Sequence, residues 1–258
     1  MKIVSLVENT TANENLTCEH GLSLYIEANN QKILFDMGQT DLFAENAKKL
    51  GLDLSQVDMA ILSHGHYDHG GGLKKFLEIN SNAPVYISKY AFGKYYNGTE
   101  KYIGLDISLQ ENSRLVFTDA KVKPGEGITL YHCNDREKSY DLGSFGLNKK
   151  VDDVLIPDDF LHEQYLCIEE NGKKVLISGC SHKGILNIVE WFQPDILVGG
   201  FHFSKLSLDE TLEEYAKVLN RYDTDYHTCH CTGVEQYQFM KKYMQRLNYL
   251  ATGNIIEF

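Results

Sequence analysis

The stretch His64-Gly65-His66-Tyr67-Asp68-His69 decides how this chain is interpreted, because it places three imidazoles and a carboxylate within six residues. It follows the apolar run Met59-Ala60-Ile61-Leu62, which is typical of a buried strand. In an extended segment residues i and i+2 point the same way, so the first two histidines can approach one ion, while Asp68 and His69 reach a second after a bend. Gly70-Gly71-Gly72 then allows the backbone to turn tightly. Because imidazole and carboxylate are common metal ligands, the stretch predicts a metal-binding loop at a strand end.

Composition limits the classes of protein to consider. The chain has 258 residues, a formal net charge of −11 and no run of Lys or Arg, which argues against a nucleic-acid substrate and leaves room for a small anionic one held by metal ions. Its apolar runs fall short of the roughly 20 residues of a membrane span, and residues 1–8 contain no signal-peptide core. We expect a single cytoplasmic domain over 1–258, with no membrane partner and with its six cysteines reduced.

Apolar periodicity predicts an alternation of strands and helices. Helical stripes occur near 42–50, 73–77, 208–219 and 234–247, and Ser207-Leu208-Asp209-Glu210 has the form of a capping box. Residues from about 91 to 160, rich in Gly and Tyr, predict an irregular insertion that forms a wall of a substrate pocket or short strands of its own. Strands are expected at 2–7, 22–27, 32–36, 59–63, 84–88, 174–178, 195–199 and 254–258. The second half repeats the rhythm of the first, which predicts an α/β fold of two packed sheets with helices outside.

Further candidate ligands follow the predicted strands of the second half. Cys180 and His182 lie in Ser-Gly-Cys-Ser-His, His202 ends Gly-Gly-Phe-His, and His230 begins His-Cys-Thr-Gly. Strand ends are where sites assemble in layered α/β folds. Each of these histidines alone would be unremarkable, but together with the loop they form a candidate ligand set.

His-x-His-x-Asp-His after a strand, with Asp36 ending the preceding strand, resembles the metallo-β-lactamase superfamily. The resemblance implies a four-layer αββα sandwich and two divalent metal ions, zinc first, with iron or manganese as alternatives. It implies that His64, His66 and a further histidine hold one ion, and that Asp36 orients the loop. The second ion would be held by Asp68, His69 and His230.

The resemblance does not decide which histidine is the third ligand of the first ion. His162 matches the superfamily's third motif if Cys180 stands where a bridging aspartate is usual, and a thiolate there is a softer ligand. The narrower resemblance is to the subgroup of 7,8-dihydropterin-6-yl-methyl-4-(β-D-ribofuranosyl)aminobenzene 5′-phosphate synthase, in which Gly-Cys-x-His is the third motif, and it favours His182. Cys229 and Cys231 are expected to pack against His230 or tune it rather than ligate.

These assignments predict a metal-dependent hydrolase that acts on a small phosphorylated or ester substrate. Asp68 would hold an ion and orient water, and His202, a residue of the substrate pocket, or His182 would protonate the leaving group. One alternative, from the subgroup, is a transferase that joins a pterin diphosphate to an aryl ribosyl phosphate. Another is a metal-containing binding or sensing module without turnover.

Overall fold

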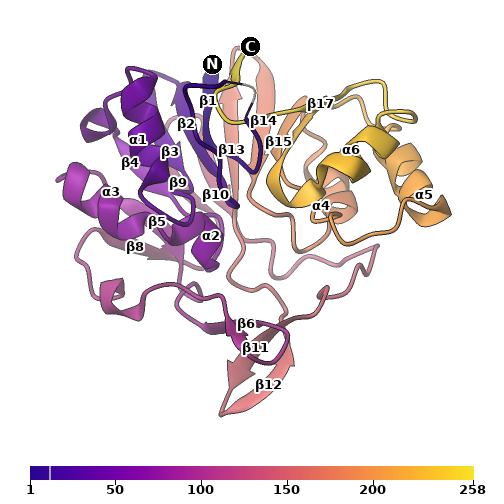
Figure 1. Ribbon diagram of the computed structural model, residues 1–258, viewed down its shortest axis with the longest axis horizontal. Helices are drawn as coiled ribbons and strands as arrows, with labels where there is room; N and C mark the ends of the chain where they lie inside the picture. Colours follow the sequence, from indigo (N-terminus) through magenta and orange to yellow (C-terminus); the bar gives the residue numbers. More distant parts are fainter. Residues whose placement is uncertain (12) are drawn as a thin grey trace.

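The computed structural model describes residues 1–11 and 13–258, and its central feature is a pair of seven-stranded sheets packed face to face. Helices α1 (Leu42–Lys49) and α3 (Leu73–Ile79) cover the outer face of one sheet, and α4 (Ile185–Phe192), α5 (Glu210–Leu219) and α6 (Val234–Met240) lie beside the other (Figure 1). The predicted αββα fold is confirmed. None of the helices in the described part of the chain is long and apolar enough to cross a bilayer.

The first sheet has the order β18-β1-β2-β3-β4-β5-β8. Its strands from β3 onward are parallel, and the others pair antiparallel. Their bounds are β1 Lys2–Val7, β2 Ser23–Ala28, β3 Gln31–Phe35, β4 Met59–Ile61, β5 Val85–Ser88, β8 Leu115–Thr118 and β18 Ile255–Glu257. Because β18 pairs with β1, the two ends of the chain lie together (Figure 1).

The second sheet has the order β17-β16-β15-β14-β13-β10-β9. The strands from β14 to β17 run parallel, so their carboxyl ends meet at one edge. Their bounds are β9 Val122–Gly125, β10 Ile128–Tyr131, β13 Tyr165–Glu170, β14 Lys173–Ser178, β15 Ile196–Gly199, β16 Asp225–Thr228 and β17 Leu247–Tyr249. The chain also contains short helical turns, namely η1 Leu54–Gln56, α2 Tyr67–Gly70, η2 Ile107–Leu109 and η3 His230–Thr232.

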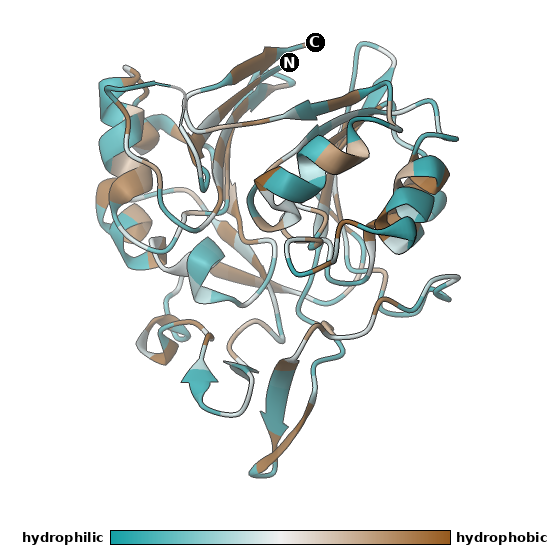
Figure 2. Ribbon diagram, turned by 45° about the vertical axis from the view of Figure 1, so that its right-hand side comes forward, coloured by the Kyte–Doolittle hydropathy of each residue, from teal (hydrophilic) through white to brown (hydrophobic). Residues whose placement is uncertain are grey.

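The core lies in three apolar layers, one between the sheets and one beneath each set of helices. Ile3, Leu24, Leu166 and Ile177, from both sheets, are fully buried in the middle layer. The hydropathy colouring shows brown strands at the centre, and both teal and brown stretches on the outer helices (Figure 2). The shared apolar layer holds the two sheets face to face, with the strand ends that carry the polar residues at the edge of the sandwich.

Part of the stretch 91–160 departs from the irregular cover expected for it, and part forms short strands of its own, which was the alternative expectation. β8, β9 and β10 belong to the two main sheets, and only β6 (Lys94–Asn97), β7 (Lys101–Tyr102), β11 (Leu147–Val151) and β12 (Val154–Pro157) form a separate four-stranded sheet. Val116 and Phe117 of β8 are exposed, so this strand lacks the alternation that marks a strand in sequence. The short separate sheet projects from one end of the sandwich (Figure 1).

Two helix ends also differ from expectation. Helix α5 begins after Asp209, whose Oδ1 accepts from the Thr211 amide at 3.0 Å, so Asp209 is the N-cap in place of Ser207. Helix α6 ends at Met240, and Leu247, expected on the same helical face, lies in β17. At α5 the capping side chain of Asp209 sets the helix start. At α6 the pairing of Leu247 with Tyr226 of β16 outweighs the apolar periodicity.

Replacing Gly199 with alanine is expected to lower the free energy of unfolding by about 3 kcal/mol or more. Gly199 has a φ of +141°, and a Cβ there would lie 1.8 Å from the Ser178 carbonyl oxygen. Gly51→Ala is the matched control, because φ is also positive (+72°) but a Cβ meets no described atom within 4 Å. Its cost should be only about 1–2 kcal/mol. Urea denaturation of both variants measures the difference; equal losses would contradict the expected clash.

Candidate metal centre

The candidate site forms where β3, β4, β14, β15 and β16 end. Four non-glycine residues at these ends have a left-handed backbone, namely Asp36 (φ 58°), Ser181 (φ 60°), His202 (φ 58°) and His230 (φ 50°). Each such residue costs about 1–3 kcal/mol and persists only where the surrounding structure holds it. The strained turns direct polar side chains into one region, and α2 brings Asp68 and His69 to the same place.

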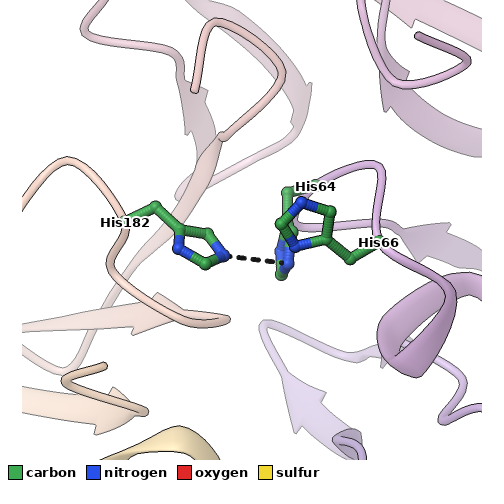
Figure 3. A group of neighbouring side chains, drawn as sticks. All are labelled: His64, His66 and His182. Carbon is green, nitrogen blue, oxygen red and sulfur yellow. Dashed lines mark hydrogen bonds between the residues drawn. The ribbon is translucent and has the colours of Figure 1, made fainter. Parts of the chain in front are cut away.

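The first donor group consists of His64, His66 and His182, with one donor atom of each residue within 4.8 Å of the others. His182 comes from the loop after β14 and faces the two histidines of the β4 loop, and its Nε2 lies 3.4 Å from His64 Nε2 (Figure 3). All three are buried, and His66 Nε2 and His182 Nδ1 have no hydrogen-bond partner among the described residues. Burial lowers the pKa of His66 to about 3, so its ring is neutral and able to donate a lone pair.

Asp36 determines which nitrogen of His64 carries the proton. Its Oδ1 accepts from the Ser63 amide at 2.7 Å, and its Oδ2 accepts from the Ser63 hydroxyl at 2.7 Å. Because that hydroxyl proton is used, Ser63 Oγ accepts from His64 Nδ1 at 2.7 Å. The lone pair of His64 is therefore on Nε2, which faces His182.

The second donor group consists of Asp68, His69, Cys180 and His230. His69 Nε2 lies 3.1 Å from Cys180 Sγ and 3.1 Å from His230 Nε2, and His230 Nε2 is 3.4 Å from Asp68 Oδ2. Burial alone would raise the pKa of Asp68, but the neighbouring His69, His20 and His230 hold it well below its usual range. Asp68 is therefore a carboxylate at neutral pH.

The second donor group also has its ring nitrogens oriented by outer partners. His69 donates from Nδ1 to Asp36 Oδ2 at 2.6 Å, and His230 donates from Nδ1 to Asn9 Oδ1 at 2.8 Å. The Asn9 oxygen is identified by the Gly21 amide, which also donates to it. The two Nε2 atoms therefore face each other at 3.1 Å, and a proton or a metal ion between them would satisfy both lone pairs.

In the metal-free protein a proton on His69 occupies this position: burial lowers its pKa, but Asp36 and Asp68 raise it above the ordinary value. Neutral imidazoles, a carboxylate and a thiol are also the ligand types of a divalent transition metal. The residues present therefore fit the metal ions that the fold implies.

His162 lies beside the first donor group but is engaged elsewhere. Its Nδ1 accepts from the Gly65 amide at 2.9 Å, and its Nε2 donates to Asp158 Oδ2 at 3.0 Å. Both ring nitrogens are thus used within the protein, whereas His182 has its ring directed at His64. Of the two histidines left open by the sequence, the structure brings His182 into the first donor group.

Buried carboxylates that the sequence reasoning missed anchor the other ligand loops. Glu163 accepts from the His182 amide at 2.6 Å and from the Lys183 amide at 3.0 Å. Glu8 accepts from the His230 amide at 2.7 Å. Glu8 directly follows the apolar strand β1, as Asp36 follows β3, and a charge at the end of a buried strand was the available signal. Glu163 offers no comparable signal in the sequence.

Replacing Glu163 with glutamine is expected to weaken metal binding about tenfold or more and to lower the free energy of unfolding by about 2–3 kcal/mol. An amide cannot accept on both sides, so one of the amides of the His182 loop, or the Tyr165 hydroxyl that donates at 2.5 Å, loses its acceptor. Competition with a chromophoric chelator and urea denaturation measure the two effects. Glu190→Gln, an exposed change on α4, is the control; equal metal affinity in both variants would contradict the anchoring role.

A cavity of about 170 Å³ opens onto both donor groups. His20 and His202 line it, and His20, exposed to solvent, has its Nε2 3.2 Å from Asp68 Oδ2. Lys101 and Lys205 also line the cavity; their ammonium groups contact the Tyr67 hydroxyl at 3.2 Å and the Phe145 carbonyl at 2.9 Å. The centre is therefore reached through a cavity that two lysine ammonium groups line.

Comparison with known proteins agrees with this fold and site. A model of the metallo-β-lactamase superfamily matches residues 16–221, and the chain belongs to that superfamily. This confirms the resemblance drawn from the histidine loop.

Individual relatives are similar over nearly the whole chain. The uncharacterised protein MJ0448 of Methanocaldococcus jannaschii is 31% identical over 262 residues, which cover 98% of each chain. The 7,8-dihydropterin-6-methyl-4-(β-D-ribofuranosyl)-aminobenzene-5′-phosphate synthase of the same organism is 29% identical over 288 residues, covering 100% of this chain and 97% of the relative. The crystal structure of Tm1679, a metal-dependent hydrolase of the β-lactamase superfamily, is 30% identical with a TM-score of 0.85, covering 100% of this chain and 99% of that one.

Proposed function

We propose that this chain is a metal-dependent hydrolase that acts on a small anionic substrate. It would bind two divalent ions, and zinc is the first candidate for their identity. The observation that carries the proposal is the pair of facing ring nitrogens in each donor group, His64 with His182 at 3.4 Å and His69 with His230 at 3.1 Å. Hydrogen bonds to Asp36 and Asn9 hold three of these four rings with their lone pairs inward, directly or through Ser63. A solvated histidine cluster has no need of such outer partners.

The first donor group would hold one ion and the second donor group the other. The ions supply Lewis acidity, which makes water a usable nucleophile near neutral pH and polarises a phosphoryl or carbonyl oxygen. Asp68, a carboxylate bonded to the cavity-lining His20, would accept a hydrogen bond from the attacking water and orient it. His202 lines the cavity, and its side chain would contact the bound substrate.

Lys101 and Lys205 support an anionic substrate. Both line the cavity of a chain whose formal net charge is −11, so the mouth of the site is locally less acidic than the molecule. An ammonium group attracts phosphate or carboxylate as a point charge. A phosphorylated ester of modest size fits the volume and these charges.

Elemental analysis and a substrate panel test the proposal. The purified protein should carry about two equivalents of zinc, iron or manganese, as the two sets of donors predict. Phosphomonoesters, phosphodiesters, carboxylic esters and thioesters should be assayed with and without a chelator, and chelation should abolish hydrolysis. Absence of bound metal after reconstitution would overturn the proposal. Bound metal with no turnover on any class would instead favour a binding or sensing role.

The transferase reaction is a second candidate, favoured by the full-length similarity to the M. jannaschii synthase. In that case the ions and Lys101 or Lys205 would stabilise a departing diphosphate in place of activating water. Incubation with a dihydropterin diphosphate and an aryl ribosyl phosphate discriminates the two. Diphosphate release with a joined product supports the transferase, and hydrolysis without joining rejects it.

A further inference from the structure

We propose that Cys180, Cys231 and His202 bind a thiolate-preferring divalent ion, at a sulfur-rich position that lies beside the second donor group and shares Cys180 with it. The proposal rests on the proposed function only in sharing Cys180 with the second donor group. We call these three residues the sulfur site. The sequence predicted that Cys231 packs beside His230 and that His202 acts on the substrate, and the sulfur site gives both residues another role.

The geometry of the sulfur site carries the proposal. One ring nitrogen of His202 and the two cysteine sulfurs all lie within 4.8 Å of one another. Bonds of about 2.3 Å to sulfur and 2.0 Å to nitrogen place tetrahedral ligand atoms roughly 3.5–3.8 Å apart, so small side-chain movements close the three donors on one ion. Cys180 is 3% and Cys231 6% exposed, and both are free thiols.

A second observation points to a missing partner. His202 Nδ1 is buried and has no hydrogen-bond partner among the described residues. Leaving such an atom unsatisfied costs about 1–3 kcal/mol, which a metal bond or a hydrogen bond would recover. The ring lies 4.4 Å from that of His182, between centroids, so the sulfur site adjoins the first donor group.

The backbone is built to bring the sulfur site together. His202 has a φ of 58°, in the left-handed region, and follows Gly199, Gly200 and Phe201. A Cβ at Gly200 would lie 2.4 Å from Cys231 Sγ, so only glycine leaves room for that thiol. Cys231 Sγ in turn contacts the Cys180 carbonyl at 3.5 Å. The backbone is therefore strained at His202 and closely packed at Gly200, where the two sulfurs and the imidazole come together.

The chemistry of the sulfur site distinguishes it from the all-nitrogen first donor group. Each cysteine thiol releases its proton to solvent as its sulfur binds the ion, and the imidazole binds through a lone pair. Two thiolates and an imidazole favour zinc, cadmium or cobalt over magnesium or calcium. His202 then acts as a ligand, and its replacement alters metal binding as well as turnover.

Cobalt titration of the full chain tests the sulfur site. Metal-free protein, prepared with a chelator under reducing conditions, is titrated with Co²⁺ while the near-ultraviolet sulfur-to-cobalt charge-transfer band is recorded. We expect a band from two thiolates in the unaltered protein and about half its intensity in Cys231→Ser, since the band scales with the number of bound sulfurs. Cys167→Ser, a 4% exposed cysteine on β13 outside the site, is the matched control and should keep the full band.

Two variants of His202 distinguish a metal-ligand role of this residue from a proton-donor role. His202→Ala should weaken cobalt binding at the sulfur site, and His202→Cys, which restores a ligand but not an imidazole acid, should restore or strengthen the band. Because Cys231→Ser can perturb folding, mass spectrometry of alkylated unaltered protein gives an independent measure. Zn²⁺ should protect Cys180 and Cys231 from the reagent, relative to metal-free protein, and leave the labelling of Cys18 unchanged.

The outcomes are distinct. A full band in Cys231→Ser, or equal labelling of Cys231 with and without Zn²⁺, would overturn the sulfur site. A disulfide between Cys180 and Cys231 that survives reduction would overturn it as well. Cobalt bound with nitrogen-type spectra and no sulfur band would reject the sulfur site while the proposed hydrolase stands, whereas no cobalt binding at all would reject both.

Discussion

His66→Ala is expected to lower turnover by more than the roughly 10- to 100-fold that outer partners of metal ligands contribute, because in the proposed site it removes a ligand itself. Metal content should fall from about two equivalents towards one. Steady-state kinetics and elemental analysis measure both effects. His132→Ala is the matched control, since His132 is also buried (3% exposed, against 4% for His66) and lies outside the donor groups.

The same variant should show an unusual stability profile. In the metal-free protein His66 Nε2 is buried without a partner, so its removal relieves a cost of about 1–3 kcal/mol that partly offsets the cavity left behind. The unaltered protein gains stability from added zinc, by about 2.7 kcal/mol at a free concentration 100 times the dissociation constant. His66→Ala should gain much less. Thermal unfolding with and without zinc checks this, and an equal zinc-induced shift in both proteins would contradict a ligand role for His66.

Asp36→Asn is expected to weaken metal affinity and turnover about 100-fold or more, the upper end for an outer partner. The asparagine amide must donate where Asp36 Oδ2 accepts from Ser63 and His69. Ser63 Oγ then donates to His64 Nδ1 in place of accepting from it, which puts the His64 proton on Nε2, the nitrogen that faces His182. His69 is reversed in the same way. One substitution therefore changes the tautomer of a histidine in each donor group.

The choice of asparagine isolates this effect from backbone strain. Asp36 has a φ of 58°, and asparagine tolerates the left-handed region as well as aspartate does. Asp58→Asn serves as the control, since its exposed side chain also accepts from a backbone amide, that of Lys32 at 2.7 Å. Chelator competition gives the metal affinity of each variant. Unchanged affinity in Asp36→Asn would show that the tautomers of His64 and His69 are not set by Asp36.

The sequence was sufficient for the sandwich and for the strand ends at which the site forms. Long apolar strands and the six-residue loop carry local information, so β1 and the position of the histidine loop after β4 were predicted correctly. β8 was missed because exposed apolar residues hide its alternation. Spacing did not decide between His162 and His182, and only the narrower resemblance favoured His182. The structure separates them because the His162 ring accepts from the Gly65 amide, 97 residues away, and donates to Asp158, 4 residues away.

The Glu8–His230 hydrogen bond joins residues 222 positions apart and ties a loop of the second sheet to the end of the first strand. Closing such a long loop is slow, because chain entropy is lost before the contact rewards it. During synthesis the histidine motif near residue 64 emerges long before His230 can meet it. Acquisition of the second ion should therefore be a late event in maturation, and a refolding experiment should show the first strands protected from hydrogen exchange before zinc is retained.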